Sequence, residues 1–427
     1  MFKQLKARLY FLVARYFRFW AALKLHRWHP RVIVITGSAG KTTLLHLLEA
    51  QLGSEAHYSH HANSSFGIPF DILGLHGIDG SRLRWFGLFL MAPLAAFTKP
   101  YTEKLYVAEV DADRPHEGAF LAKLLKPEVT LWVSALHSHT AQYDSAVQAG
   151  RFETVREAVA HEYGNVAAAT RKLVILDGDN DLMLSQLDRT QADTQQVKIA
   201  DLKSYTLNPK TSEFVFQGVT YTIPAILPRN NYYQLAMVDG LLRYLNKTPD
   251  YAYKNFVMPP GRSNIFEGIK GTTIFDSTYN NSNIDSLRSV LETFEAYPAE
   301  HKWAVVGDML EQGQDEAMEH NKLAEALASL NVERLILIGP RVAKHTAPRL
   351  EGKLAANTKL EVFTQPADVL IYLQSNLHGG ETILFKGIRY LEGVIEPLLA
   401  NPSDASKLAR RGAAWDKKRA AWGVGPS

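Results

Sequence analysis

The chain has 427 residues, enough for two or three domains, and its 46% hydrophobic and 21% charged content is ordinary for a globular protein. It contains no cysteine, which excludes disulfides and thiolate metal sites and is compatible with the cytoplasm. The net charge of +3 indicates little by itself, and we expect no nucleic-acid partner.

Residues 1–30 predict a basic amphipathic helix. No Asp or Glu precedes Glu49, and arginines interrupt the apolar stretch, so a membrane-spanning helix is not expected. The helix either lies on a membrane surface through residues 1–28 or docks on its own domain with solvated lysines. A second apolar run, residues 85–97, either joins it at the interface or is buried. The apolar positions of the first stripe recur at spacings of three and four: Phe2, Leu5, Leu9, Leu12, Tyr16, Phe19 and Leu23.

Residues 32–43 predict a strand, a glycine turn and a helix. The backbone N–H groups of such a turn form an anion site, Lys41 supplies a cation for a β/γ-phosphate, and Thr42 supplies a hydroxyl for Mg²⁺. The alternative is a tight strand–helix turn with an incidental lysine. The predicted nucleotide-binding residues are Gly37, Ser38, Ala39, Gly40, Lys41, Thr42 and Thr43.

Alternating strands and helices then predict a parallel α/β sheet. Further strands are expected at 105–110, 129–134 and 173–176, and a small antiparallel patch at 198–223. The Pro-Pro-Gly sequence at 259–261 marks a domain boundary.

A second α/β pattern follows this boundary. Its strands are expected at 272–275, 303–306, 335–338 and 382–385, and residues 401–427 read as a mobile basic tail. The predicted fold is therefore a P-loop ATPase domain with a parallel sheet at 31–258, followed by a smaller Rossmann-like α/β domain at 259–400.

Several segments together resemble the Mur ligases, and among them the D-alanyl-D-alanine-adding MurF enzymes. The shortened loop Thr-Gly-x-x-Gly-Lys-Thr-Thr is similar to theirs, as are Lys-Pro-Glu-Val at 126–129 and Asp-Ser-Thr-Tyr-Asn at 276–280. Gly-Asp-Met-Leu-Glu at 307–311 and Lys-Gly-Ile-Arg at 386–389 match further family motifs.

The resemblance implies an ATP- and Mg²⁺-dependent ligase that activates a carboxylate as an acyl phosphate and then forms an amide. It implies metal binding by Glu109 and His139, and a phosphate contact by Arg262. It also implies a ribose contact by Asp276 and a place near the nucleotide for Asn280. The expected partners are a cell-wall peptide precursor and an amino acid or dipeptide. The oligomeric state is left open.

Three departures from the family pattern matter. Only about thirty residues precede the loop strand, too few for the UDP-binding domain of the MurF enzymes, so a lipid-linked or otherwise different acceptor is expected. Tyr163 aligns with the carbamylated lysine of the family, with His161 or Glu162 as substitutes. Ser277 replaces an aspartate.

We therefore interpret the chain as an ATP-dependent amide-forming ligase of cell-wall synthesis, cytoplasmic and peripheral at the membrane's inner face. The alternatives are a ligase for another amide polymer, such as polyglutamate, and a nucleotide-binding scaffold without catalysis.

Overall fold

The computed structural model describes residues 2–60, 62–76, 82–112, 114–135, 143, 147–279, 284–310, 312–387 and 390–425. The chain forms two compact units. The first comprises the residues up to Asp201 together with Tyr232–Asp250, and the second comprises Leu202–Asn231 together with the residues from Tyr251 onward. The segment 202–231 therefore clusters with the second unit.

The first unit is built on a parallel sheet of order β2-β3-β1-β4-β5-β6. Its strands are β1 (Arg31–Thr36), β2 (Ala56–Tyr58), β3 (Leu105–Val110), β4 (Val129–Trp132), β5 (Leu173–Asp177) and β6 (Asp193–Val197). β1 is central because it is a β-branched apolar run that is buried on both faces. The carboxyl ends of β1, β3 and β4 lie together, in the register that pairs Thr36 with Val110 and with Trp132.

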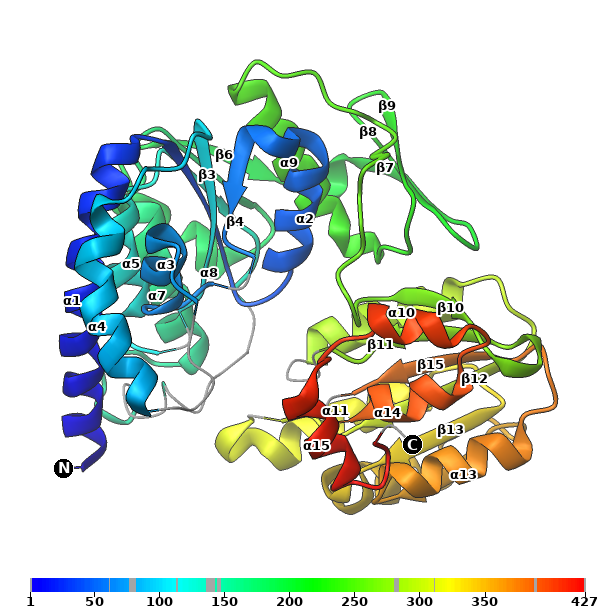
Figure 1. The fold of residues 1–427 in the computed structure, drawn as a ribbon. Helices are drawn as coiled ribbons and strands as arrows, with labels where there is room; N and C mark the ends of the chain where they lie inside the picture. The colour runs from blue at the N-terminus through cyan, green and yellow to red at the C-terminus, as the bar shows by residue number, and fades with distance from the viewer. Residues whose placement is uncertain are drawn as a thin grey trace. The chain divides into compact units, whose positions relative to one another are not determined.

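Helices cover both faces of this sheet (Figure 1). They are α1 (Phe2–Trp28), α2 (Lys41–Leu52), α3 (Gly67–Leu73), α4 (Arg82–Phe97), α5 (Glu117–Leu125), α7 (Val155–Ala168), α8 (Asp181–Leu184) and α9 (Tyr232–Tyr244). α2 packs beside α9, whereas α1 packs against α3, α4 and α5. The core on the α1 side includes Val32 and Val34, alternate residues of β1.

Helix α1 docks through a different face from its predicted stripe. Ala14, Phe17 and Ala21 are fully buried in the core with α3 and α4. Stripe residues such as Leu12 and Phe19 remain 64% and 63% exposed. The small alanines allow close approach of the helices, so the docked face is set by packing as well as by hydrophobicity.

The second unit contains a six-stranded sheet of order β10-β11-β15-β12-β13-β14, in which only β10 is antiparallel to its neighbour, and a three-stranded antiparallel sheet of β7, β8 and β9. The strands are β7 (Leu202–Leu207), β8 (Ser212–Phe216), β9 (Val219–Ile223), β10 (Asn264–Glu267), β11 (Thr273–Ser277), β12 (Lys302–Gly307), β13 (Arg334–Ile338), β14 (Lys359–Phe363) and β15 (Thr382–Lys386). The helices are α10 (Ile284–Ala296), α11 (Glu316–Ala328), α12 (Ala347–Leu350), α13 (Pro366–Asn376), α14 (Leu391–Ile395) and α15 (Ala413–Ala420). The predicted α/β class is confirmed.

The larger sheet is covered on both faces. Ala304 and Val306 of β12 pack into the core with α10 and α11, whereas Trp303 and Val305 pack into the core with α13 and α14. This two-sided burial explains why the central strands read as continuous apolar runs.

The segment from residue 401 onward differs from the mobile tail expected from its composition. It contains α15, and Val424 lies in the apolar core of the second unit. The Arg419 guanidinium is buried and donates to the carbonyl of Arg410 at 2.7 Å. Basic composition predicted solvation, but the aliphatic stems and neighbouring apolar residues allow this segment to pack.

Candidate functional site

In the glycine turn between β1 and α2, the backbone lies so close to neighbouring residues that a side chain would not fit. Gly37 has a φ of +131°, and a Cβ there would lie 2.8 Å from the backbone N and O of Ser134. Gly40 has a φ of +82°, and its Cβ would lie 2.3 Å from Gln234 Nε2. The first turn of α2 follows directly, so its N–H groups and the turn present an anion-binding arrangement.

Ser134, at the end of β4, fixes the middle of this turn. Its hydroxyl accepts a hydrogen bond from Ala39 N at 2.9 Å and lies 3.1 Å from Ser38 Oγ. Its carbonyl accepts from Ser38 N at 3.2 Å. Sequence reasoning missed Ser134 because nothing in its local sequence marks it; its role comes from the pairing of β4 with β1.

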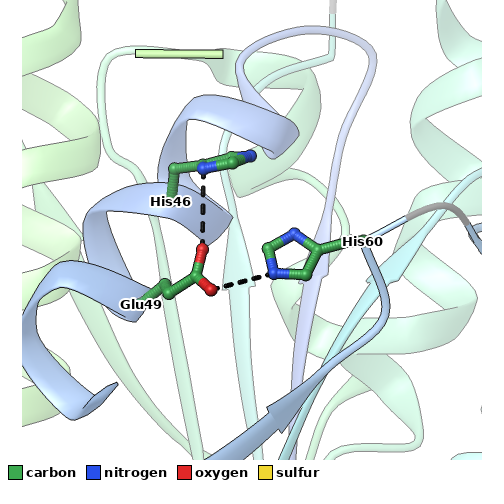
Figure 2. Close-up of side chains that lie close together, drawn as sticks. All are labelled: His46, Glu49 and His60. Carbon is green, nitrogen blue, oxygen red and sulfur yellow. Dashed lines mark hydrogen bonds and ion pairs between the residues drawn. The ribbon is translucent and has the colours of Figure 1, made fainter. Parts of the chain in front are cut away.

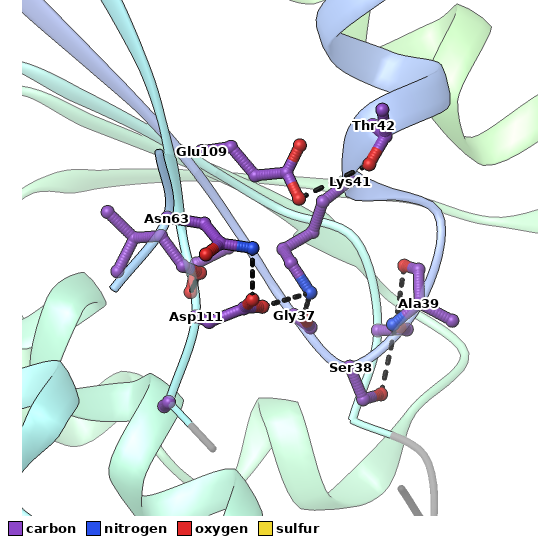
Figure 3. Close-up of polar contacts among 12 residues, drawn as sticks. Gly37, Ser38, Ala39, Lys41, Thr42, Asn63, Glu109 and Asp111 are labelled. Atoms are coloured by element: carbon purple, nitrogen blue, oxygen red, sulfur yellow. Dashed lines mark hydrogen bonds and ion pairs between the residues drawn. The ribbon is translucent and has the colours of Figure 1, made fainter. Parts of the chain in front are cut away.

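Lys41 is buried and makes charge-assisted contacts beneath the turn. Its Nζ donates to the carbonyl of Gly37 at 2.6 Å and lies 2.5 Å from Asp111 Oδ1 (Figure 3). Asp111 also accepts from Asn63 Nδ2 at 2.5 Å. A three-residue link therefore joins the glycine turn, the end of β3 and the loop that carries Asn63.

Thr42 and Glu109 meet as expected for a cation site. Thr42 Oγ1 donates to Glu109 Oε1 at 3.3 Å, and Glu109 N donates to Ser59 Oγ at 2.8 Å. A hydroxyl and a carboxylate beside a phosphate-binding turn are the oxygen donors that Mg²⁺ takes. The glycine cradle, Lys41 and this donor pair thus fit a nucleoside triphosphate with Mg²⁺. Thr43 is buried and extends the same helix.

Two predicted site residues, His139 and Asn280, lie outside the described residues. Glu162, one suggested substitute for the carbamylated lysine, and Tyr163, which aligns with that lysine, have other roles in the described part of the chain. The other suggested substitute, His161, packs its ring 5.2 Å from that of Phe152, and burial lowers the pKa of its imidazole. Glu162 Oε1 accepts from Gly118 N at 3.0 Å, at the start of α5, and Tyr163 is buried in an apolar core. Neither side chain is presented as a metal ligand.

The loop that carries Asn63 is also tied to helix α1. Glu117 Oε1 accepts from both N and Oγ of Ser65 at 2.9 Å, and from Tyr10 Oη at 3.4 Å. The ring of Tyr10 packs edge-on against Phe66, with centroids 4.8 Å apart. The loop thus lies between α1 and the Lys41–Asp111 pair.

In the second unit, the predicted ribose contact Asp276 lies in β11. The residue is fully buried, and its Oδ1 accepts from Thr278 N at 3.0 Å and Thr278 Oγ1 at 2.7 Å. Burial raises the pKa of Asp276 to about 6. Oδ1 of this carboxyl group supports the loop after β11, and the ribose contact stays a prediction.

Arg262 lies over the exposed ring of Tyr279, with its guanidinium carbon 3.9 Å from the ring centroid. Arg410 lies 5.3 Å from the same centroid and donates to Glu392 and to the carbonyl of Tyr279. Two guanidinium groups therefore hold one aromatic side chain. Arg410 was missed because it comes from the segment expected to be a mobile tail.

Two further residues of the family-like motifs are built into the fold. Burial lowers the pKa of Lys386 to about 7; the positive charges of Arg262 and Arg410 lower it as well, whereas Asp276 raises it. Asp308 Oδ1 accepts from Arg341 N at 2.9 Å and Val342 N at 2.8 Å. Asp308 thus caps the start of the helical segment that follows β13.

Comparison with known proteins gives a consistent family. The family described as "Mur ligase, glutamate ligase domain" matches residues 261–389. The UDP-N-acetylmuramoyl-tripeptide--D-alanyl-D-alanine ligase of Bacillus subtilis is 24% identical over 387 residues, which cover 87% of this chain and 76% of that protein. The Escherichia coli enzyme of the same name is 22% identical, with 87% and 77% covered.

Solved structures agree on the fold. The MurF ligase from Thermotoga maritima in complex with ADP superposes with a TM-score of 0.71 at 21% identity, covering 90% of this chain and 83% of that one. FolC of E. coli, in complex with DHPP and ADP, gives a TM-score of 0.54 at 16% identity, with 87% and 89% covered. In sequence the chain is thus similar to Mur ligases, the MurF enzymes among them, and it shares their fold.

Proposed function

We propose that this chain is an ATP-dependent ligase that forms an amide bond on a cell-wall peptide precursor. The observation that carries the proposal is the glycine turn with Lys41 beneath it and the Thr42–Glu109 pair beside it. Similarity to Mur ligases supports the reaction class, since the curated relatives are named as ligases that join D-alanyl-D-alanine to a muramoyl tripeptide.

The reaction needs charge neutralisation more than a covalent protein group. The acceptor carboxylate attacks the γ-phosphorus and releases ADP, and the amine then displaces phosphate and leaves an amide. Lys41 and the turn N–H groups would balance the phosphate charge, and Thr42 and Glu109 would hold Mg²⁺, which supplies further charge neutralisation. Roles for His139, Arg262 and Asn280 belong to the same proposal.

The test is phosphate release with purified full-length protein, ATP, Mg²⁺ and candidate acceptors, with D-alanyl-D-alanine or single amino acids as the amine. We expect release that requires both acceptor and amine, and a product longer by the added residue. Turnover with a folate or glutamate acceptor alone would favour the polyglutamate alternative. Nucleotide binding without turnover on any acceptor would favour the scaffold.

Helices α1 and α4 support the membrane-surface part of the proposal. They pack side by side, with Tyr16 Oη donating to the carbonyl of Phe89 at 2.6 Å. Eight of the fourteen exposed large hydrophobic side chains in the described part of the chain lie on these two helices. We define these eight as the exposed helix face: Leu9, Leu12, Phe19, Phe86, Leu90, Met91, Leu94 and Phe97.

The charge composition of these two helices suits an anionic bilayer. α1 and α4 contain no Asp or Glu, while both contain Arg, and α1 also contains Lys. Within the described residues, none of the helices is both long and apolar enough to cross a bilayer. An apolar face on basic helices of this kind is typical of binding in the interface plane.

This face also bears on the acceptor. The loop of Asn63 packs on α1 through Tyr10 and Phe66. A membrane-bound α1 would therefore hold this loop near the headgroups, which favours a lipid-linked precursor as acceptor over a freely diffusing one.

Vesicle co-sedimentation tests whether the exposed helix face binds a membrane. Phe19→Glu combined with Leu90→Glu is expected to abolish binding to vesicles that contain phosphatidylglycerol. Ile371→Glu is the matched control, because Ile371 on α13 is 63% exposed, as Phe19 is. Unchanged binding of the double variant, or equal loss in the control, would contradict the membrane proposal.

A further inference from the structure

Helix α2 and the loop after β2 bring two histidines and a glutamate together outside the phosphate-binding turn. Glu49 Oε1 lies 3.0 Å from His60 Nε2, and Glu49 Oε2 lies 3.6 Å from His46 Nδ1 (Figure 2). One ligand atom from each of the three residues lies within 4.8 Å of the others. The imidazole rings are 5.2 Å apart between centroids.

The spacing follows from the helix and the strand. His46 and Glu49 are three residues apart on α2, so they share one face of the helix. His60 lies two residues beyond the end of β2, and its N–H donates to the carbonyl of Tyr58 at 3.0 Å, which turns the chain toward α2. The cluster is thus formed by two separate elements.

The donor set is that of a transition metal and not of Mg²⁺. Two imidazoles and one carboxylate, with a fourth position left to water, form a known zinc coordination sphere. Ligand atoms around a tetrahedral zinc are separated by roughly 3.3 Å, given metal–ligand distances of about 2.0 Å. The side chains of His46, Glu49 and His60 are 23%, 40% and 32% exposed, and their ligand atoms already lie within 4.8 Å of one another, so small rotamer changes can bring them to that separation.

We propose that His46, Glu49 and His60 bind one Zn²⁺ ion, a site separate from the Thr42–Glu109 pair. The ion fastens the loop after β2 to α2. The first residue of α2 is Lys41, and the loop after β2 continues through Ser59, which holds Glu109, to Asn63, which holds Asp111. Zinc therefore rigidifies the support of the nucleotide site without entering it.

The test is titration of the full-length, metal-stripped protein with ZnCl₂ in buffer that contains millimolar Mg²⁺. We expect saturation at one Zn²⁺ per chain and a rise in the thermal melting temperature that a chelator reverses. His46→Ala and His60→Ala should each weaken binding by about 100-fold or more, and Glu49→Gln by about 10-fold or more.

The matched control is His301→Ala. His301 Nδ1 lies 2.7 Å from Glu333 Oε1, and both side chains are exposed. Among the described residues, this pair is not part of a group of three possible metal ligands. This variant should bind Zn²⁺ as the unchanged protein does. Equal loss in His301→Ala, or no loss in His46→Ala and His60→Ala, would overturn the proposal.

Substitution of Co²⁺ provides a readout that does not depend on stability. A tetrahedral His₂Glu site gives visible d–d absorption, which should appear in the unchanged protein and be weakened in Glu49→Gln, a conservative change in shape. If the three residues only form hydrogen bonds, the variants will lower the melting temperature in metal-free buffer while no saturable Zn²⁺ or Co²⁺ binding appears in any protein. That result would overturn the proposal.

Discussion

The charged residues around the glycine turn and those around Tyr279 are assembled in different ways. Lys41 and Thr42 lie within a contiguous segment, and their partners Glu109 and Asp111 come from one neighbouring strand end. The cluster around Tyr279 draws residues from four distant parts of the second unit: Arg262, Asp276, Glu392 and Arg410.

The two clusters differ in the chemistry of their groups: those of the first suit a ligand, whereas those of the second support the fold. The first cluster combines backbone N–H groups, a cation and oxygen donors, which is what a nucleotide with a metal ion requires. In the second, Asp276 and Glu392 are buried and make their contacts to loop residues and to Arg410. We therefore expect substitutions in the first cluster to affect activity above all, and those at Glu392 and Arg410 in the second to affect stability.

The largest effect is expected for Lys41→Ala. Removing the cation beneath the turn should lower kcat/KM by about 1,000-fold or more, because charge neutralisation is the main contribution to phosphoryl transfer. The phosphate-release assay measures this loss, and ATP affinity should fall as well. Lys172→Ala, an exposed lysine of the same unit, should retain full activity. Wild-type activity in Lys41→Ala would contradict the assignment of the glycine turn to the nucleotide-binding site.

A smaller effect on activity is expected for Glu109→Gln. The amide keeps an acceptor for Thr42 but loses the charge, so the apparent Mg²⁺ affinity should fall by about 10- to 100-fold. Activity should recover in part at high Mg²⁺, and titration of Mg²⁺ at saturating ATP measures this. A loss of activity that Mg²⁺ does not restore would show that Glu109 has another role.

In the second cluster, Arg410→Ala should destabilise the fold. The substitution leaves the carboxylate of Glu392, which is 1% exposed, without its cation, at a cost of about 3 kcal/mol in the free energy of unfolding. Arg411→Ala is the neighbouring control, because the side chains of Arg411 and Glu396 in this ion pair are 30% and 26% exposed. The pair should therefore contribute less than about 1 kcal/mol to the free energy of unfolding. Denaturant unfolding compares them, and equal effects would contradict the distinction.

The same contrast explains what the sequence could predict. Apolar β-branched runs identified the central strands, such as β1 and β12, because burial on both faces fixes their composition. The edge strands β2, β6 and β14 were missed, since they are short or polar and depend on pairing with one neighbour.

Site residues follow the same rule. The contiguous loop at 37–43 was predictable residue by residue, and its geometry agrees with the chemistry expected of it. The roles of Ser134 and Arg410 were not, because each depends on a contact about 95 to 130 residues away. The buried state of Asp276 was hidden for the same reason: a motif indicates which residue is present, but packing decides whether a ligand can reach it.

A direct probe of the second cluster is the pH dependence of stability in Lys386→Met. Burial holds the folded pKa of Lys386 at about 7, below its ordinary value of 10.5. Between these values the unfolded chain binds the proton and the folded chain does not, so unfolding becomes harder as pH rises, by up to about 1.4 kcal/mol per pH unit. Below pH 7 both states are protonated and the slope from this group vanishes.

Unfolding free energies at pH 7, 8, 9 and 10 should therefore rise less steeply in Lys386→Met than in the unchanged protein. Lys172→Met, from an exposed position, should leave the slope unchanged. Parallel curves for Lys386→Met and the unchanged protein would mean that this ammonium group is solvated, and the second cluster would then resemble the first in being open to a ligand.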